Sequence, residues 1–295
     1  MPAFTTRLHA LRLTVALAAC MAACAAGTLS AQQVFVRMRR GVRLGAVRPA
    51  ELTNANGSPR VTDTVRYAAV WQRIAPALDR WARDPRLAID PNFVAALMAK
   101  ESGGDSLAVS AAPALGVAQL TAAADMDLRA MAASERLAWM RDEVHTWPRA
   151  PAVHAARASK AVVDSLLANG TLSSRTEYLF DPLLGARAAE FWLRALVDKW
   201  TTDAWPGGYG TFARRALNEG RPLDEDQLVD VVTVSYNRGY LRVHDLVARY
   251  GAQWTDHLAE LGPDGAEAAD YLARVRTYAR LFSAAPPAGP ASPGS

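Results

Sequence analysis

Residues 90–101 read DPNFVAALMAKE, the most apolar helical segment of the predicted domain. Asp90 is a preferred N-cap residue and Pro91 suits the first helical position, so a helix is predicted from here to about Glu101. The side chains of residues 93–99 are all apolar, which leaves this helix almost no polar face. Such a helix is buried on most sides, so the rest of the chain is expected to pack around it.

The remainder of the chain shows the same helical signals. From Val61 onward apolar residues follow helical spacing, and no long alternation of apolar and polar residues favours strands. Asp181 with Pro182 is a second N-cap residue followed by a proline, and Asp224 with Gln227 has the spacing of a capping box. Further helices are therefore predicted at about 182–200, 224–236 and 266–282. The predicted fold class is all-α.

The first 31 residues have the pattern of an export signal. Arg7 and Arg12 precede an apolar segment, and residues 29–31 offer a cleavage site. Residues 17–20, LAAC, resemble a bacterial lipobox, which predicts a lipid anchor on Cys20; an ordinary signal peptide is the alternative. We therefore expect an exported protein of the periplasm or cell envelope, either soluble or an outer-membrane lipoprotein. A membrane contact is expected only through this anchor.

The segments that flank the main domain are rich in small residues and turn residues. Residues 32–60 are predicted to be a linker or an extended arm, residues 61–282 the folded domain, and residues 283–295 a disordered tail. The net charge of +4 falls to +2 when the two signal arginines are removed, too little to favour a nucleic-acid partner. Both cysteines lie in the signal and the histidines lack metal-ligand spacing, so neither metal nor cofactor is expected.

Glu101 is notable because its carboxyl group continues the apolar stripe of the helix at residues 90–101. Phe93, Leu97 and Glu101 are four residues apart and lie on one face. Burial disfavours the charged carboxylate, and so does the negative end of the helix dipole. Both effects are expected to raise the pKa of Glu101, as a general acid at neutral pH requires. Helix physics alone leaves an alternative, a structural carboxyl that turns into water or pairs with Lys100 or an arginine.

The residues that follow Glu101 resemble the first motif of the soluble lytic transglycosylase (SLT) family. That motif is E-S-x-x-x-x-x-A-x-S-x-x-x-A-x-G-L-M-Q-L, and residues 101–120 align with it without a gap. The matching positions are Glu101, Ser102, Ala108, Ser110, Ala114, Gly116, Gln119 and Leu120.

Three later segments resemble the other motifs of this family, in the same order. Residues 181–193 resemble D-P-x-x-N-I-x-A-G-x-x-Y-L, and residues 234–239 (VSYNRG) resemble A-Y-N-A-G. Glu267 and Tyr271 keep the spacing of E-T-x-x-Y-V. Together the motifs span about residues 60–282. The resemblance implies a lysozyme-like, all-α lytic transglycosylase domain with a helical insertion at about 121–180.

The resemblance also implies roles for individual residues. Glu101 matches the catalytic acid, Tyr236 is implied to hydrogen-bond its carboxyl, and Asn237 is implied to contact the substrate. The implied substrate-binding residues are Ser102, Gln119, Tyr236, Asn237 and Tyr271, with Glu267 as a supporting residue. The side chain of Gln119 suits an amino sugar because it has both a donor and an acceptor, but a glutamine that ties a loop is the alternative.

The implied reaction is cleavage of peptidoglycan glycan strands without a cofactor. The family's Glu protonates the β-1,4 bond between N-acetylmuramic acid and N-acetylglucosamine. It then accepts a proton from the C6 hydroxyl, which gives a 1,6-anhydro product. Ordinary glycosidases place two carboxyl groups across the bond, and no second acid is evident beside Glu101 in the motif. The alternatives are a goose-type-lysozyme-like hydrolase of the same bond and a catalytically impaired glycan-binding envelope protein.

The sequence also departs from the family pattern. Residues 117–118 are Val-Ala where the motif has Leu-Met, and Arg238 replaces a small residue beside Tyr236 and Asn237. Residues 121–180 are longer than the usual link and hold helix-like runs at 135–144 and 152–167. We hypothesise that this insertion forms a lid or wall of the substrate groove.

Overall fold

The structure is a computed structural model that describes residues 41–110, 114–148, 178–262 and 265–284, together with 165, 168 and 169. Regular structure in these ranges is almost entirely helical, which confirms the predicted all-α class. The α-helices are α2 (Thr64–Trp81), α3 (Pro91–Ser102), α4 (Ala122–Ala132), α5 (Ala138–Thr146), α8 (Pro182–Thr201), α9 (Tyr209–Asn218), α10 (Glu225–Arg238), α11 (Tyr240–Tyr250) and α12 (Gly265–Ser283). The 3-10 helices are η1 (Pro49–Glu51), η2 (Tyr178–Phe180) and η3 (Gly251–Leu261).

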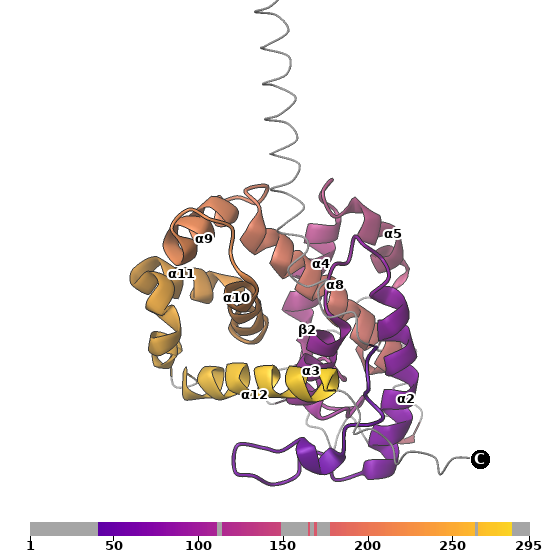
Figure 1. The fold of residues 1–295 in the computed structure, drawn as a ribbon. Helices are drawn as coiled ribbons and strands as arrows, with labels where there is room; N and C mark the ends of the chain where they lie inside the picture. The colour runs from indigo at the N-terminus through magenta and orange to yellow at the C-terminus, as the bar shows by residue number, and fades with distance from the viewer. Residues whose placement is uncertain are drawn as a thin grey trace, which may run out of the picture.

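The helices form two groups that share two long connecting helices. Figure 1 shows α9, α10 and α11 on one side and α2, α4 and α5 on the other. Helix α8 contacts both groups, and α12 packs along α3 and reaches α10 and η3. The apolar face of α3 therefore lies at the centre of the molecule, and residues 93–99 are all buried, as the sequence predicts.

Local capping explains why the main helices begin where they do. The carboxylate of Asp90 accepts a hydrogen bond from Asn92 N at the start of α3, and Asp181 does the same for the first turn of α8. Asp224 and Gln227 exchange both bonds of a capping box at the start of α10. Each of these N-termini and the final helix at 265–283 agrees with the sequence prediction to within one or two residues.

A short β-hairpin and helix α4, which follow α3 in the chain, were not evident from the sequence. Residues 114–115 (β1) and 120–121 (β2) pair as a short antiparallel hairpin, and Thr121 then caps helix α4 by accepting from Ala124 N at 3.1 Å. Helix α5 corresponds to the helix-like run predicted at 135–144. The run predicted at 152–167 lies outside the described residues, apart from residue 165.

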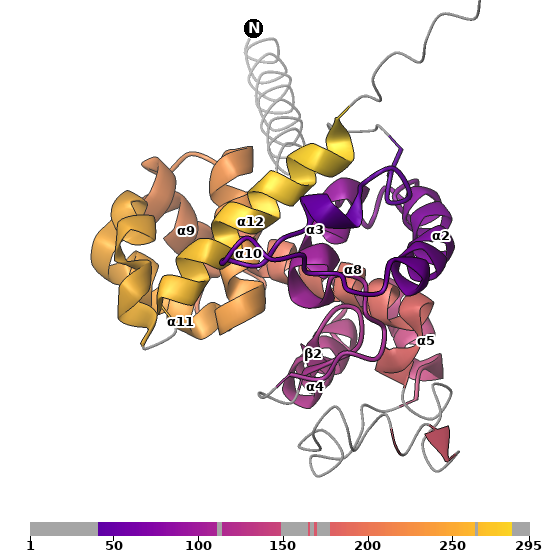
Figure 2. The same ribbon diagram turned by 90° about the horizontal axis from the view of Figure 1, so that it is seen from below.

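Residues 41–63, which we call the arm, pack onto the helices. The sequence predicts a linker or an extended arm up to residue 60; the structure shows Leu44 and Leu52 fully buried in the core. The hydroxyl of Tyr67 on α2 donates to the backbone carbonyl of Val47 at 3.2 Å. Figure 2 shows the arm, in indigo, running past α3 between α12 and α2.

The predicted signal segment lies outside the described residues, as does nearly all of the predicted tail; Ser283 is the last residue of α12. Among the helices in the described ranges, none combines the length and the apolar character that crossing a bilayer demands.

Candidate active site

Glu101 lies in the last turn of α3, where that buried helix reaches the surface. Gly103 ends the helix in the left-handed conformation, with φ of 63°, and its N–H donates to the carbonyl of Ala99. Residues 94–99 are fully buried, whereas Glu101 itself is partly exposed. Glu101 therefore lies on a rigid core element at the point where the helix becomes partly accessible, a placement that suits a catalytic group.

The carboxyl group of Glu101 is protonated more readily than an ordinary glutamate. Burial is the main cause and raises its pKa to about 7, and the negative charge of Glu267 adds to the rise. A hydrogen bond from Tyr271 and the positive charges of Arg60 and Lys100 act in the opposite direction. A pKa near neutrality lets one group both donate and accept a proton at physiological pH.

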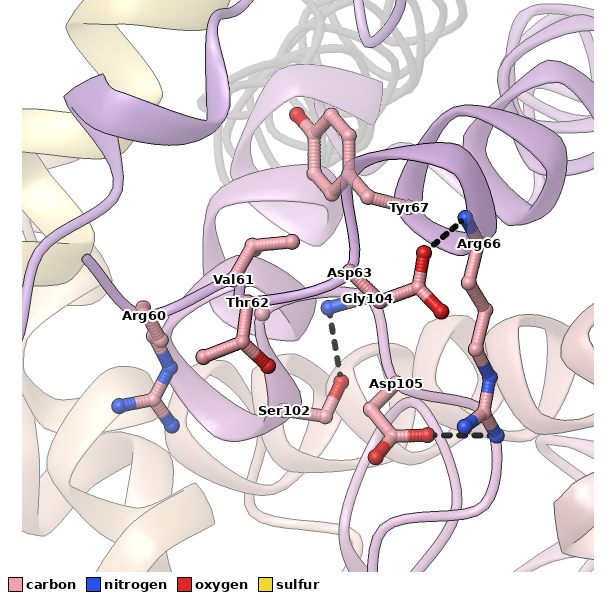
Figure 3. Close-up of a pocket in the computed structure, with 10 residues that line it drawn as sticks. Arg60, Val61, Thr62, Asp63, Arg66, Tyr67, Ser102, Gly104 and Asp105 are labelled. Carbon is pink, nitrogen blue, oxygen red and sulfur yellow. Dashed lines mark hydrogen bonds and ion pairs between the residues drawn. The ribbon is translucent and has the colours of Figure 1, made fainter.

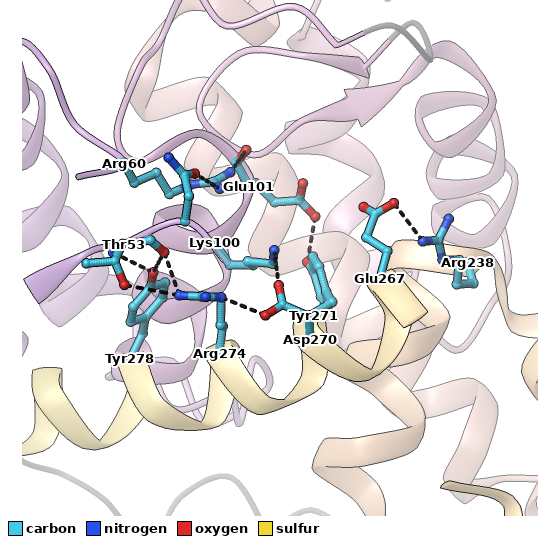
Figure 4. Close-up of polar contacts among 11 residues, drawn as sticks. Thr53, Arg60, Lys100, Glu101, Arg238, Glu267, Asp270, Tyr271, Arg274 and Tyr278 are labelled. Carbon is cyan, nitrogen blue, oxygen red and sulfur yellow. Dashed lines mark hydrogen bonds and ion pairs between the residues drawn. The ribbon is translucent and has the colours of Figure 1, made fainter. Parts of the chain in front are cut away.

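The hydroxyl that holds this carboxyl comes from α12. Tyr271 is buried and donates to Oε1 of Glu101 at 2.5 Å, as Figure 4 shows. The resemblance implies this role for Tyr236, but the Tyr236 hydroxyl donates instead to the backbone carbonyl of Ala118 at 2.7 Å. The physical reason is packing: α12 lies directly along α3, whereas α10 brings Tyr236 to the loop after β1.

Gln119 and Ser102 both hold the loop of the hairpin in place. Nε2 of Gln119 donates to the carbonyls of Ala108 and Gly116 at 3.0 and 2.9 Å, so its amide donors serve the loop rather than a sugar. Ser102 donates to the carbonyl of Val117 at 2.8 Å. In the structure the amide nitrogen of Gln119 therefore ties the loop, as the alternative interpretation of this residue has it. Ser102 links the same loop to the end of α3.

Asn237 and Glu267 occupy different electrostatic settings near the ends of α10 and α12. The side-chain carbonyl oxygen of Asn237 is buried and has no hydrogen-bond partner among the described residues, so its implied contact with a substrate stays a prediction. Glu267 forms an ion pair with Arg238 at 3.0 Å. The arginine that departs from the family pattern therefore pairs with the carboxylate whose charge acts on Glu101.

A pocket of about 210 Å³ opens beside Ser102, between the arm, the start of α2 and the loop after α3. Figure 3 shows its polar walls, where Arg66 pairs with Asp105 at 2.8 Å. Arg60, which also lines this pocket, was missed by sequence analysis because it lies in a segment without helical periodicity. Among the described residues, no group of three or more His, Cys, Asp and Glu side chains is placed to hold a metal ion.

A raised pKa does not by itself identify the catalytic acid. Burial raises the pKa of Glu190 to about 8. That side chain is 1% exposed inside α8 and is paired with Arg187 at 3.0 Å, and Arg187 also holds Glu143 at 2.8 Å. No glycan can reach a carboxyl enclosed in this way. Glu101 differs because it combines a neutral-range pKa with partial exposure at a helix end.

The pH dependence of activity is expected to follow the ionisation of Glu101. If Glu101 is the acid that the resemblance implies, it must be protonated to start the reaction, so kcat/KM should fall by about tenfold per pH unit above pH 7. Replacing Tyr271 with phenylalanine removes the hydrogen bond that lowers this pKa, so the falling limb should move to higher pH. The turnover below pH 6 should decrease about tenfold, because the carboxyl loses its orientation. A pH–rate profile of both proteins measures each effect; an unmoved limb would contradict the assigned contact.

Comparison with known protein families supports the resemblance. Residues 82–140 match the family model described as the transglycosylase SLT domain, which confirms the resemblance over this stretch. The matched stretch includes Glu101, Ser102 and Gln119; the three later motifs lie beyond it and remain predictions. Searches among curated proteins and among solved structures give no match. The SLT match indicates a peptidoglycan-cleaving transglycosylase.

Proposed function

We propose that this protein is an exported lytic transglycosylase, which cleaves the β-1,4 bond between N-acetylmuramic acid and N-acetylglucosamine in peptidoglycan. The observation that carries the proposal is the carboxyl group of Glu101. Glu101 lies at the end of a buried helix, and the pKa of its carboxyl is about 7. The hydroxyl of Tyr271 donates a hydrogen bond to this carboxyl at 2.5 Å and orients it. The export signal predicted in residues 1–31 agrees with a substrate in the cell envelope.

In the proposed mechanism Glu101 acts first as acid and then as base. The protonated carboxyl donates its proton to the glycosidic oxygen while the bond from that oxygen to C1 of the muramic acid breaks. The carboxylate then accepts the proton of the C6 hydroxyl, whose oxygen attacks C1 and closes the 1,6-anhydro ring. Glu101 ends the cycle protonated, and no water is consumed. A pKa close to the working pH suits both proton transfers.

The surroundings of Glu101 speak against a two-carboxyl mechanism. A two-carboxyl glycosidase needs a second carboxylate that is free to attack the sugar or to activate water. Glu267 is close enough for its charge to act on Glu101, but Arg238 holds it at 3.0 Å.

Mass spectrometry of purified peptidoglycan digested by the protein tests the proposal. A lytic transglycosylase leaves muropeptides that end in 1,6-anhydro-muramic acid, and these are one water lighter than their hydrolysed counterparts. Reducing ends would overturn the proposal in favour of a goose-type-lysozyme-like hydrolase. A complete absence of fragments, with the protein still bound to the glycan, would identify a binding protein instead. A digest with Glu101→Gln is the matched blank.

A further inference from the structure

The arm of residues 41–63 is fastened to α12 through the backbone of Thr53. Its carbonyl oxygen accepts hydrogen bonds from Nη1 of Arg274 at 2.6 Å and from the hydroxyl of Tyr278 at 2.8 Å. Arg274 is paired with Asp270 at 2.8 Å, and Asp270 with Lys100 at 3.1 Å. A continuous set of polar contacts therefore joins the arm, α12 and the last turn of α3, as Figure 4 shows.

Arg60 connects the arm directly to the backbone of Glu101, the candidate acid. Its Nη2 donates to the backbone carbonyl oxygen of Glu101 at 2.5 Å, and its Nη1 lies 3.4 Å from Oδ1 of Asn54 on the same arm. The last carbonyls of a helix have no partner within the helix, so an outside donor is needed there. A cation also suits the negative end of the helix dipole.

The arm fits closely against the end of α3. A Cβ atom added at Gly103 would lie 3.0 Å from Cγ of Arg60 and 3.2 Å from Cγ2 of Val61. These distances are tighter than ordinary contacts, so the arm would have to shift to admit a side chain at the helix terminus. The stem of Arg60 is therefore held by packing as well as by hydrogen bonds.

Several charged or titratable groups face Glu101 from different elements. Arg60 comes from the arm, Lys100 from α3, Tyr271 and Glu267 from α12, and Tyr236 from α10. Lys100 is paired with Asp270, whereas Arg60 forms no ion pair within the described part of the chain. Burial lowers the pKa of Arg60, but a guanidinium remains charged at neutral pH because its ordinary pKa is so high.

We propose that Arg60 is a positioning residue of the active site, which holds the last turn of α3 so that the carboxyl of Glu101 faces the glycosidic bond. The inference rests on the proposed function. It extends the active site to an arm that lies outside the stretch matched by the SLT family model. The arm then contributes to catalysis without touching the substrate's reacting atoms.

The test compares Arg60→Met with Arg48→Met in the full chain. Methionine keeps much of the arginine stem but removes the charge and the donors, and Arg48 is an exposed residue of the same arm. Arg60→Met should lower kcat at pH 6 by about tenfold, because a misplaced acid transfers protons poorly. It should also move the falling limb of the pH–kcat profile to higher pH, because a cation that lowers the pKa of Glu101 is gone. Arg48→Met should change neither quantity.

A second variant separates charge from geometry. Arg60→Lys keeps the charge but lacks the guanidinium fork, so the limb should return toward the parental pH while kcat recovers only in part. Titration of the Glu101 carboxyl by carbon NMR, with labelled glutamate, reads the same change without an activity assay. If Arg60→Met folds and keeps the parental kcat at pH 6, the positioning role is overturned, and a shift of the limb or the titration then reports only the lost charge. If Arg60→Met does not fold, parental kcat in Arg60→Lys overturns it.

The outcome for Glu101→Gln keeps this inference apart from the proposed function. Parental activity in Glu101→Gln would reject the function itself. Loss of activity in Glu101→Gln together with no effect at Arg60 would reject only the positioning role.

Discussion

Replacement of Glu101 by glutamine is expected to lower the turnover of peptidoglycan by at least about 100-fold, the usual contribution of a positioned general acid. Glutamine has nearly the same shape, and its amide oxygen can still accept the hydrogen bond of Tyr271. It has no acidic proton to give to the leaving oxygen and cannot accept one from the C6 hydroxyl. The fold should therefore persist while both proton transfers fail.

Release of soluble muropeptides from purified cell wall, measured as an initial rate at pH 6, checks this expectation. The matched control is Glu219→Gln, the same chemical change at an exposed carboxyl at the end of α9. The control should retain the parental rate, and thermal unfolding should show that both variants are folded. A Glu101→Gln protein that clears the wall as fast as the parent would exclude Glu101 as the acid.

Replacement of Gly116 by alanine is expected to destabilise the fold by about 3 kcal/mol or more. Gly116 has φ of 71°, where an L-residue with a side chain is strained by about 1–2 kcal/mol. A Cβ at this position would lie 1.7 Å from the carbonyl oxygen of Leu179, so the backbone on one side must also move. Overpacking of this kind adds about 1–3 kcal/mol. The candidate site should also be disturbed, because the carbonyl oxygen of Gly116 accepts a hydrogen bond from Gln119 in the loop next to Ser102.

Urea unfolding of the two proteins measures the difference in the free energy of unfolding. The matched control is Gly220→Ala: Gly220 has φ of 85°, but a Cβ there would meet no atom within 4 Å. It should lose only the conformational contribution, about 1–2 kcal/mol. If the two alanine variants lose the same stability, the contact between residues 116 and 179 is looser than the structure shows.

The sequence by itself determined the main helices and the candidate acid. Asp90, Asp181 and Asp224 cap their helices with their own side chains, a local interaction that leaves a local pattern. The position of Glu101 on an apolar stripe is equally local, and its raised pKa follows from burial of that stripe. The hairpin and α4 left weaker signals, because two-residue strands are too short to show alternation.

The groups that surround that acid became evident from the packing of the helices. Tyr236 and Tyr271 both lie in segments that resemble family motifs. Because α12 packs along α3, the hydroxyl that reaches the carboxyl of Glu101 is that of Tyr271. In the same way, the fold of one loop engages the amide of Gln119, and the docking of the arm brings Arg60 to the carbonyl of Glu101 from 41 residues away. Periodicity and caps describe a residue's neighbours along the chain, whereas a hydroxyl or a guanidinium meets its partner only after separate elements have packed.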